Sequence, residues 1–274
     1  MPSIFRTALA AAVLAGGFAA TQASAAVCTG ACGSLGANGD VSAPPDGSGS
    51  YGWISTFGGV NGAGQLASVG GTDGSSFATS AFTATAGQNL HYNFNFVSSD
   101  GQDAPGQFIY EDYASVQLID VSTGNPVAML FNARTEPAGT IVPGTGLPPI
   151  SPGVTLNPAS VTMSAGSGTN GAPNWSPLGD YSGQCWGPGC GLTGWIQSDY
   201  TIPADGTYAL LFGVTNWGDT VYDSGLAYSG INIGGIPIGE DVPEPAAWAM
   251  LLTGLLSMGA VLRGGRRTPA AVRV

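Results

Sequence analysis

Acidic side chains that could bind a cation are concentrated in two segments rich in turn-forming residues. One holds Asp100-Gly101-Gln102-Asp103 and then Glu111-Asp112, and the other places Asp219 and Asp223 near Asn216. Calcium takes six to eight oxygen ligands, so converging carboxylates and carbonyls suit it. We therefore predict calcium as the one candidate cofactor, stabilising the fold through Asp100, Asp103, Asp112, Asp219 and Asp223. The spacing is not that of an EF-hand, and the alternative is that these aspartates serve turns and caps.

The four cysteines form two close pairs, Cys28/Cys32 and Cys185/Cys190. An even number of cysteines in an exported chain indicates disulfides, and four cysteines allow three pairings. Spacing favours local pairing, while a staple between the two regions would close a longer loop and stabilise more. Zinc is disfavoured because the single histidine, His91, is far from both pairs in the sequence.

Catalytic chemistry is poorly supported, and we expect no enzyme. A Ser-His-Asp or Cys-His site would have to use His91, which lies among asparagines and is better explained as facing solvent. Glycosidases need two carboxylates flanking one bond, but Glu111 and Asp112 are adjacent, and adjacent residues on a strand point to opposite faces. A secreted hydrolase is thus the least favoured class.

Tryptophans gather in the second half of the chain, and their faces can stack on sugars. Trp195 and Trp217 lie in or beside apolar segments, where core packing explains them. Trp186 lies inside the loop between Cys185 and Cys190, so we expect it to be exposed. Trp186 and Trp175 are the candidate glycan contacts.

The elements that must position these residues are predicted to be strands. In Asn89 to Val97, apolar residues alternate with His91, Asn93 and Asn95, which is the period of a half-buried strand. Further strands are predicted at Tyr113 to Asp120, Val127 to Phe131, Val161 to Met163, Trp195 to Ile202, Thr207 to Val214 and Leu226 to Ile233. No sustained helical period occurs before residue 242. The pattern predicts an all-β fold, an antiparallel β-sandwich of jelly-roll type.

Two segments are predicted to be loops. Gly58 to Ser76 is rich in Gly and Ser, and Thr135 to Pro158 is rich in proline. The stretch from 234 to 241 is interpreted as a tether.

Charge is distributed very unevenly along the chain. There is no lysine, five of the six arginines lie near the termini, and sixteen of the seventeen acidic residues lie between Asp40 and Asp241. Between residues 26 and 241 the only basic residue besides His91 is Arg134. Such a surface repels nucleic acid, so we expect no nucleic-acid partner. The alternative interpretation is that the acidic residues only keep the protein soluble.

The N-terminus has the pattern of a signal peptide. Arg6 precedes an apolar run from Ala8 to Ala20, and Ala23-Ser24-Ala25 supplies a small-x-small cleavage site for signal peptidase. A permanent N-terminal anchor would need a longer apolar span.

The C-terminus combines Pro243-Glu244-Pro245, an uncharged segment from Ala246 to Leu262, and Arg263, Arg266 and Arg267. As a helix the segment reaches the short end of what spans a bilayer, and the arginines keep the C-terminus cytoplasmic. This tail resembles the PEP-CTERM sorting signal of Gram-negative, biofilm-forming bacteria. The resemblance implies that the Pro-Glu-Pro tripeptide is recognised by an exosortase, with cleavage nearby. The arginines are split by Gly264-Gly265 here, a mild departure from the pattern.

The segment ahead of the tail resembles a recurring PEP-CTERM protein type without an assigned activity. The likeness is carried by residues 28–33, 112–114, 174–179, 185–195, 212–217 and 222–227. It implies one domain that includes both cysteine pairs.

Together these patterns predict an exported protein, anchored transiently in the inner membrane and then placed at the cell surface or outside the cell. We expect a signal peptide at 1–25, a sandwich at 26–233, a tether at 234–241, a sorting signal at 242–267 with a transmembrane helix at 246–262, and a cytoplasmic tail at 268–274. The predicted role is structural or adhesive, in an envelope or biofilm rich in exopolysaccharide. The alternative is a carbohydrate-binding module that uses exposed Trp and Asp.

Overall fold

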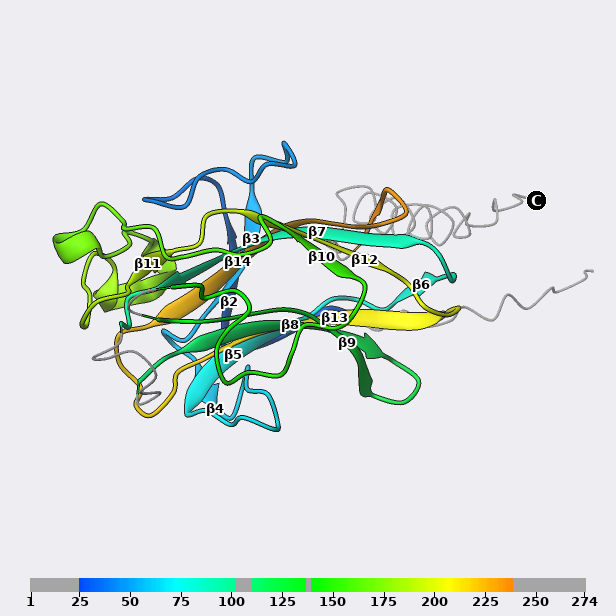
Figure 1. The fold of residues 1–274 in the computed structure, drawn as a ribbon, viewed down its shortest axis with the longest axis horizontal. Helices are drawn as coiled ribbons and strands as arrows, with labels where there is room; N and C mark the ends of the chain where they lie inside the picture. Colours follow the sequence, from blue (N-terminus) through cyan, green and yellow to red (C-terminus); the bar gives the residue numbers. More distant parts are fainter. Residues whose placement is uncertain (1–24, 102–109, 137–138, 239–274) are drawn as a thin grey trace, which may run out of the picture.

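The computed structural model describes residues 25–101, 110–136 and 139–238. They form two stacked antiparallel sheets, which confirms the predicted all-β sandwich (Figure 1). One sheet, called sheet A here, has the order β1-β5-β13-β8-β9, with β4 and β6 at its margins. Its strands are β1 (Val27–Thr29), β4 (Val60–Asn61), β5 (Asp73–Ala78), β6 (Phe82–Ala84), β8 (Tyr113–Asp120), β9 (Asn125–Arg134) and β13 (Gly206–Thr215).

The second sheet, sheet B, has the order β10-β12-β7-β14-β3-β2, with β11 beside β7 and β15 beside β14. Its strands are β2 (Ala31–Leu35), β3 (Tyr51–Ser55), β7 (Asn89–Ser98), β10 (Val154–Asn157), β11 (Gly191–Leu192), β12 (Ile196–Thr201), β14 (Ser224–Ile233) and β15 (Ile236–Pro237). Two short 3₁₀ turns, η1 (Thr169–Gly171) and η2 (Ser176–Tyr181), lie near β11 at one end of the sandwich, on the left of Figure 1.

The main core fills the space between the sheets, and it follows the alternation seen in the sequence. On β7, Leu90, Tyr92, Phe94 and Phe96 are all buried in it. Phe94 meets Phe131 of β9 with ring centroids 3.7 Å apart. Burial of such rings is the dominant stabilising contribution in a sandwich core. The prediction of a strand here is confirmed, but the strand is buried on both faces from Tyr92 onward.

A second apolar cluster covers part of the outer face of sheet B. It includes Val41, Trp175 and Leu178 from the connections, packed on Tyr51 and Val97 from the strands. This layer explains why Asn93 and Asn95, on the outward face of β7, are also buried. The sequence pattern predicts a solvated face there, because the covering residues come from segments more than 50 positions away.

The structure differs from the predicted elements in several places. Val161 forms only an isolated bridge with Val142, so Val161 to Met163 is not a strand. Gly58 to Ser76 contains β4 and the start of β5, and the proline-rich segment contains β10. The N-terminal strands β1, β2 and β3 were not predicted, because glycines, serines and cysteines hide their alternation. β15 pairs with β14 inside the predicted tether, so sheet B continues past Ile233.

In the part of the chain that the structure describes, no helix is long and apolar enough to cross a bilayer. The predicted signal peptide and the predicted span 246–262 both lie outside the described residues.

Candidate functional site

The ends of five strands bring acidic residues together at one end of the sandwich. Thr215 at the end of β13 pairs with Tyr113 at the start of β8 and with Gly74 near the start of β5. Ser224 at the start of β14 pairs with Ser98 at the end of β7. The residues just beyond these ends therefore lie close together, since antiparallel strands begin and end at a shared edge. We call this group the carboxylate cluster: Asp73, Asp100, Glu111, Asp112, Asp219 and Asp223.

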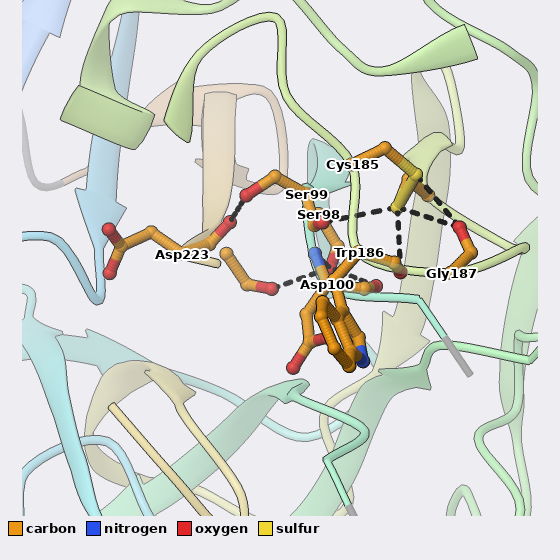
Figure 2. Close-up of a disulfide and its surroundings, with 9 residues drawn as sticks. Ser98, Ser99, Asp100, Cys185, Trp186, Gly187 and Asp223 are labelled. Atoms are coloured by element: carbon orange, nitrogen blue, oxygen red, sulfur yellow. Dashed lines mark hydrogen bonds between the residues drawn. A yellow bond between two sulfur atoms is a disulfide. The ribbon is translucent and has the colours of Figure 1, made fainter. Parts of the chain in front are cut away.

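Hydroxyl groups fix the backbone beneath the carboxylate cluster. The Ser98 hydroxyl donates to the Asp100 carbonyl at 2.9 Å and accepts from the Asp100 N–H at 3.0 Å. The backbone N–H and the hydroxyl of Ser99 both donate to the Asp223 carbonyl, at 3.1 and 2.7 Å. These bonds tie the end of β7 to the start of β14 and hold Asp100 in place (Figure 2).

Four of the carboxylates have protein donors. Thr56 Oγ1 donates to Asp223 Oδ1 at 2.8 Å. The Trp217 N–H donates to Asp112 Oδ1 at 3.0 Å, and Asn216 Nδ2 donates to Asp73 Oδ1 at 3.0 Å. The Val221 N–H donates to Asp219 Oδ1 at 3.2 Å, a local contact that supports the turn-geometry alternative for Asp219.

Asp100 is different from these residues. Its side chain is 1% exposed, and neither carboxylate oxygen meets a hydrogen-bond donor among the described residues. Figure 2 shows it beside the Trp186 indole, with the Asp223 carboxylate directed away from it. Asn216, which is also fully buried, has a side-chain oxygen without a donor in the described part of the chain. Buried polar atoms without partners cost free energy, so they require an explanation.

Burial and mutual repulsion shift the carboxyl pKa values upward. Burial raises the pKa of Asp100 to about 10, with further increases from the charges of Asp112, Asp219 and Glu111 and a weaker lowering by the Gly101 N–H. Burial also raises the pKa of Asp112, against hydrogen bonds from Ser224 and Trp217. The pKa of Asp223 is raised to about 6, first by burial, and that of Asp219 is raised for the same reason.

The one arginine between residues 26 and 241 lies at this same end. Arg134 is buried, and its Nε donates to the Glu111 carbonyl at 3.2 Å and its Nη1 to the Thr145 carbonyl at 3.4 Å. The guanidinium also lies 5.0 Å from the Trp217 ring centroid and 5.6 Å from that of Tyr113. Burial lowers the pKa of Arg134, while the charges of Glu111, Tyr113 and Asp112 oppose the shift. The Arg134 guanidinium is thus a buried positive charge with several carboxylates near it.

Three aromatic rings adjoin the carboxylate cluster. We call Tyr181, Trp186 and Tyr222 the aromatic ledge. Tyr222 lies between the other two, with ring centroids 4.7 Å from Tyr181 and 5.5 Å from Trp186. Trp186 is 43% exposed, and its backbone N–H donates to the Ser99 carbonyl at 3.0 Å. The Cys185–Cys190 disulfide closes the loop that carries Trp186. Trp186, the exposed member of the ledge, is thus held on a short, crosslinked loop.

The structure places the other predicted site residues as follows. Cys28 bonds to Cys32 and Cys185 to Cys190, as the spacing favours. Asp100, Asp112, Asp219 and Asp223 meet at one end, while Asp103 and the sorting-signal residues Pro243, Glu244, Pro245, Arg263, Arg266 and Arg267 lie outside the described residues. Within the described residues, no three His, Cys, Asp or Glu side chains form a ready-made metal-binding group.

Trp175 as a glycan contact was a wrong prediction. Its side chain is 1% exposed, and its indole N–H donates to the Tyr51 hydroxyl at 2.9 Å. The ring fills the second apolar cluster, where it lies against Gly225 of β14, whose absent side chain leaves room for it. The sequence does not signal this burial, because Trp175 precedes Ser176-Pro177, a turn-like pair.

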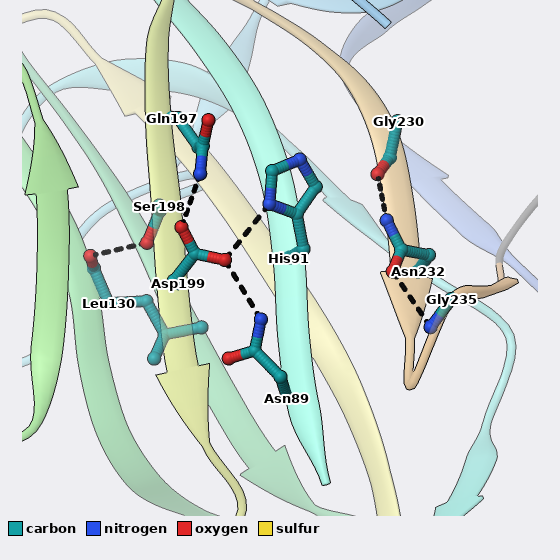
Figure 3. A network of polar contacts seen from close by, with 9 residues as sticks. All are labelled: Asn89, His91, Leu130, Gln197, Ser198, Asp199, Gly230, Asn232 and Gly235. Carbon is teal, nitrogen blue, oxygen red and sulfur yellow. Dashed lines mark hydrogen bonds and ion pairs between the residues drawn. The ribbon is translucent and has the colours of Figure 1, made fainter.

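His91 has a structural environment that is separate from the carboxylate cluster. Its Nδ1 lies 3.0 Å from Asp199 Oδ1 on the neighbouring strand β12, and Asn89 and Gln197 also donate to Asp199 (Figure 3). Burial alone would raise the pKa of Asp199, but the hydrogen bonds from Gln197, Asn89 and His91 lower it. The pair is partly exposed on the outer face of sheet B, as expected for a surface cross-strand contact.

A hollow of about 410 Å³ lies on sheet A. Among the described residues, its lining contains no charged residue and no aromatic ring, and includes Asn61, Gln65, Ser76, Ser115 and Gln117.

Comparison with known proteins identifies no relative. No family model matches the chain, and neither the curated proteins nor the solved structures contain a match. Function must therefore be argued from the residues themselves.

Proposed function

We propose that the chain is an exported surface or matrix protein with a structural or adhesive role in an envelope rich in exopolysaccharide. In this proposal signal peptidase removes residues 1–25, and an exosortase processes the chain at the Pro243-Glu244-Pro245 signal after the 246–262 helix has anchored it in the membrane. The described sandwich, of jelly-roll type in this proposal, is then the part that remains outside the cell. In this proposal the protein is not an enzyme.

The observation that carries this proposal is the pair of disulfides. Cys28–Cys32 and Cys185–Cys190 account for all four cysteines, and no free cysteine remains. Disulfides of this kind are typical of proteins that fold outside the reducing cytoplasm. The strongly acidic composition between residues 26 and 241 agrees with a surface that stays hydrated among polysaccharides.

Cell fractionation tests the sorting step. The parent chain and a variant with Pro243, Glu244 and Pro245 all replaced by alanine are compared in membrane, surface and medium fractions. A variant with Pro237 replaced by alanine, upstream of the signal, is the matched control. We expect the triple variant to accumulate in the inner membrane and the control to distribute like the parent. Identical distribution of all three chains would contradict the proposal.

The aromatic ledge favours a second candidate function, carbohydrate binding. Tyr181, Tyr222 and Trp186 pack against one another in a row, and Trp186 is exposed, so its ring is available for stacking on a sugar. Because the chain carries sixteen acidic residues against one arginine between residues 26 and 241, it would repel acidic polysaccharides. The ligand favoured by this arrangement is a neutral polysaccharide.

Affinity electrophoresis through gels containing a neutral glucan tests this candidate. We expect retardation of the parent, loss of retardation in Trp186→Ala, and partial retention in Trp186→Phe, which keeps a ring. Val127→Ala removes an exposed apolar side chain elsewhere and should migrate like the parent. Equal retardation of Trp186→Ala and the parent would exclude the ledge, and no retardation of the parent would exclude this candidate for that polysaccharide.

A further inference from the structure

The buried carboxylate of Asp100 has no partner that explains its position. It is 1% exposed, and both oxygens are without a hydrogen-bond donor among the described residues. Burying an ionised carboxylate without a partner is strongly unfavourable. The Ser98 hydroxyl nevertheless fixes the Asp100 N–H and carbonyl, so the main chain at Asp100 cannot move toward solvent without breaking those two bonds.

Protonation leaves this arrangement incomplete. A neutral carboxyl group carries one O–H, which needs an acceptor, and its carbonyl oxygen still needs a donor. No hydrogen-bond donor meets either oxygen of Asp100 in the described residues. Arg134, the one arginine at this end, directs Nε and Nη1 to the carbonyls of Glu111 and Thr145. A ligand that accepts electron pairs from the oxygens would satisfy Asp100.

Two further carboxylates are near enough to act on Asp100 electrostatically. Asp112 is itself fully buried, and its Oδ2 has no hydrogen-bond donor among the described residues. The charges of Asp112 and Asp219 both act on Asp100. Asp100 follows the end of β7, Asp112 directly precedes β8, and Asp219 lies in the β13–β14 connection. Asn216, on the same connection as Asp219, adds a buried amide oxygen without a donor.

We propose that this end of the sandwich binds one divalent cation, with Asp100, Asp112 and Asp219 as its carboxylate ligands. The available donor atoms are all oxygens, and His91 and both disulfides supply no alternative ligand, so the donor set favours calcium over zinc or copper. The described residues hold no ready-made group of three ligands, so binding would have to draw Asp112 and Asp219 toward Asp100. The charge of the cation would then offset the repulsion among the three carboxylates.

Binding a cation at this position would also affect the aromatic ledge. Asp219 and Asp223 lie in the β13–β14 connection, which also carries Tyr222 of the aromatic ledge, and Asp100 forms a bridge with Trp186. Tyr222 has a positive φ of 59°, a conformation that is unfavourable for a bulky residue. A cation joining Asp100 to Asp219 would therefore hold together the two segments that carry the ledge.

The experiment measures thermal unfolding of the mature protein isolated from cells and treated with EDTA. Addition of about 10 mM calcium chloride should raise the melting temperature by about 3 to 11 °C, the rise that dissociation constants of about 0.1 to 1 mM, typical of extracellular calcium modules, give for a domain of this size. Isothermal titration should give one calcium per chain. An unchanged melting temperature would overturn the proposal, and an equal rise with magnesium chloride would overturn the choice of calcium.

Variants separate a ligand from a residue that merely supports the fold. We expect Asp100→Asn to lose the calcium response while its melting temperature in EDTA stays close to that of the parent, because burial raises the pKa of Asp100 to about 10 and an uncharged amide then replaces an uncharged carboxyl group. Asp180→Asn, on an exposed carboxylate, should respond like the parent. Asp219 lies on a partly exposed connection, so Asp219→Asn tests the proposal even if Asp100→Asn fails to fold. This variant should need at least about ten times more calcium for the same rise in melting temperature. A full calcium response in Asp219→Asn would overturn the assignment.

Discussion

Arg134 should be the single most costly charged residue to remove from this protein. It is buried, its guanidinium makes hydrogen bonds to the Glu111 and Thr145 carbonyls, and it lies over the rings of Trp217 and Tyr113. Arg134→Met keeps much of the apolar stem but removes the charge and the donors. Removing one member of a buried charged group costs about 3 to 5 kcal/mol, because its partners stay buried without compensation. For a domain of this size that corresponds to a fall in melting temperature of about 6 to 20 °C.

Circular dichroism at a β-sheet wavelength, followed with temperature at neutral pH in EDTA, measures this loss. Arg134→Lys should be intermediate, because a compact ammonium group keeps the charge but cannot span two carbonyls as the planar guanidinium does. Adding Glu111→Gln to Arg134→Met should recover part of the loss, since it removes a nearby carboxylate. If Arg134→Met unfolds within about 0.5 kcal/mol of the parent, the interpretation of Arg134 as the internal counter-charge of the carboxylate cluster is refuted.

Three further predictions concern pH, the disulfide loop and the two faces of β7. Burial raises the pKa of Asp223 to about 6 from 3.8 in the unfolded chain, so between these values the folded state keeps a proton that the unfolded state has lost. In EDTA the melting temperature should therefore fall as pH rises from about 4.5 to about 7. A rise over that window would contradict the burial of Asp223. Replacing both Cys185 and Cys190 by serine should cost about 2 kcal/mol in urea unfolding, the loop-closure value for so short a loop, whereas no change would mean that the loop is ordered without its crosslink. Phe94→Ala should cost about 3 to 5 kcal/mol and His91→Ala less than about 1 kcal/mol, and comparable losses would contradict the assignment of their faces.

The strands with strict alternation could be predicted from the sequence because local pattern and tertiary burial agree there. Residues 89–97 and 113–120 match β7 and β8 closely, and their apolar faces form the main core. The edge strands β1 and β2 escaped prediction since edge positions tolerate small and polar residues, which leave no alternation to detect.

The candidate site was predictable only in part. The acidic segments around Asp100 and Asp219 are visible in the sequence, but their convergence depends on the pairing of strand ends that are more than 100 residues apart. Arg134 offered a signal, because a lone arginine in an acidic segment is expected to have a special environment. The burial of Trp175 offered none, since it depends on the layer that the connections build over sheet B.

The mass of the mature protein tests the central claim, export and sorting of this chain, most directly. The protein should be isolated from the cell surface or medium and measured intact, before and after reduction. We predict an N-terminus at Ala26, a C-terminus near Pro243-Glu244-Pro245, and a mass increase on reduction that corresponds to two disulfides. A mass that still includes residues 1–25 or the segment 246–274 would contradict the account.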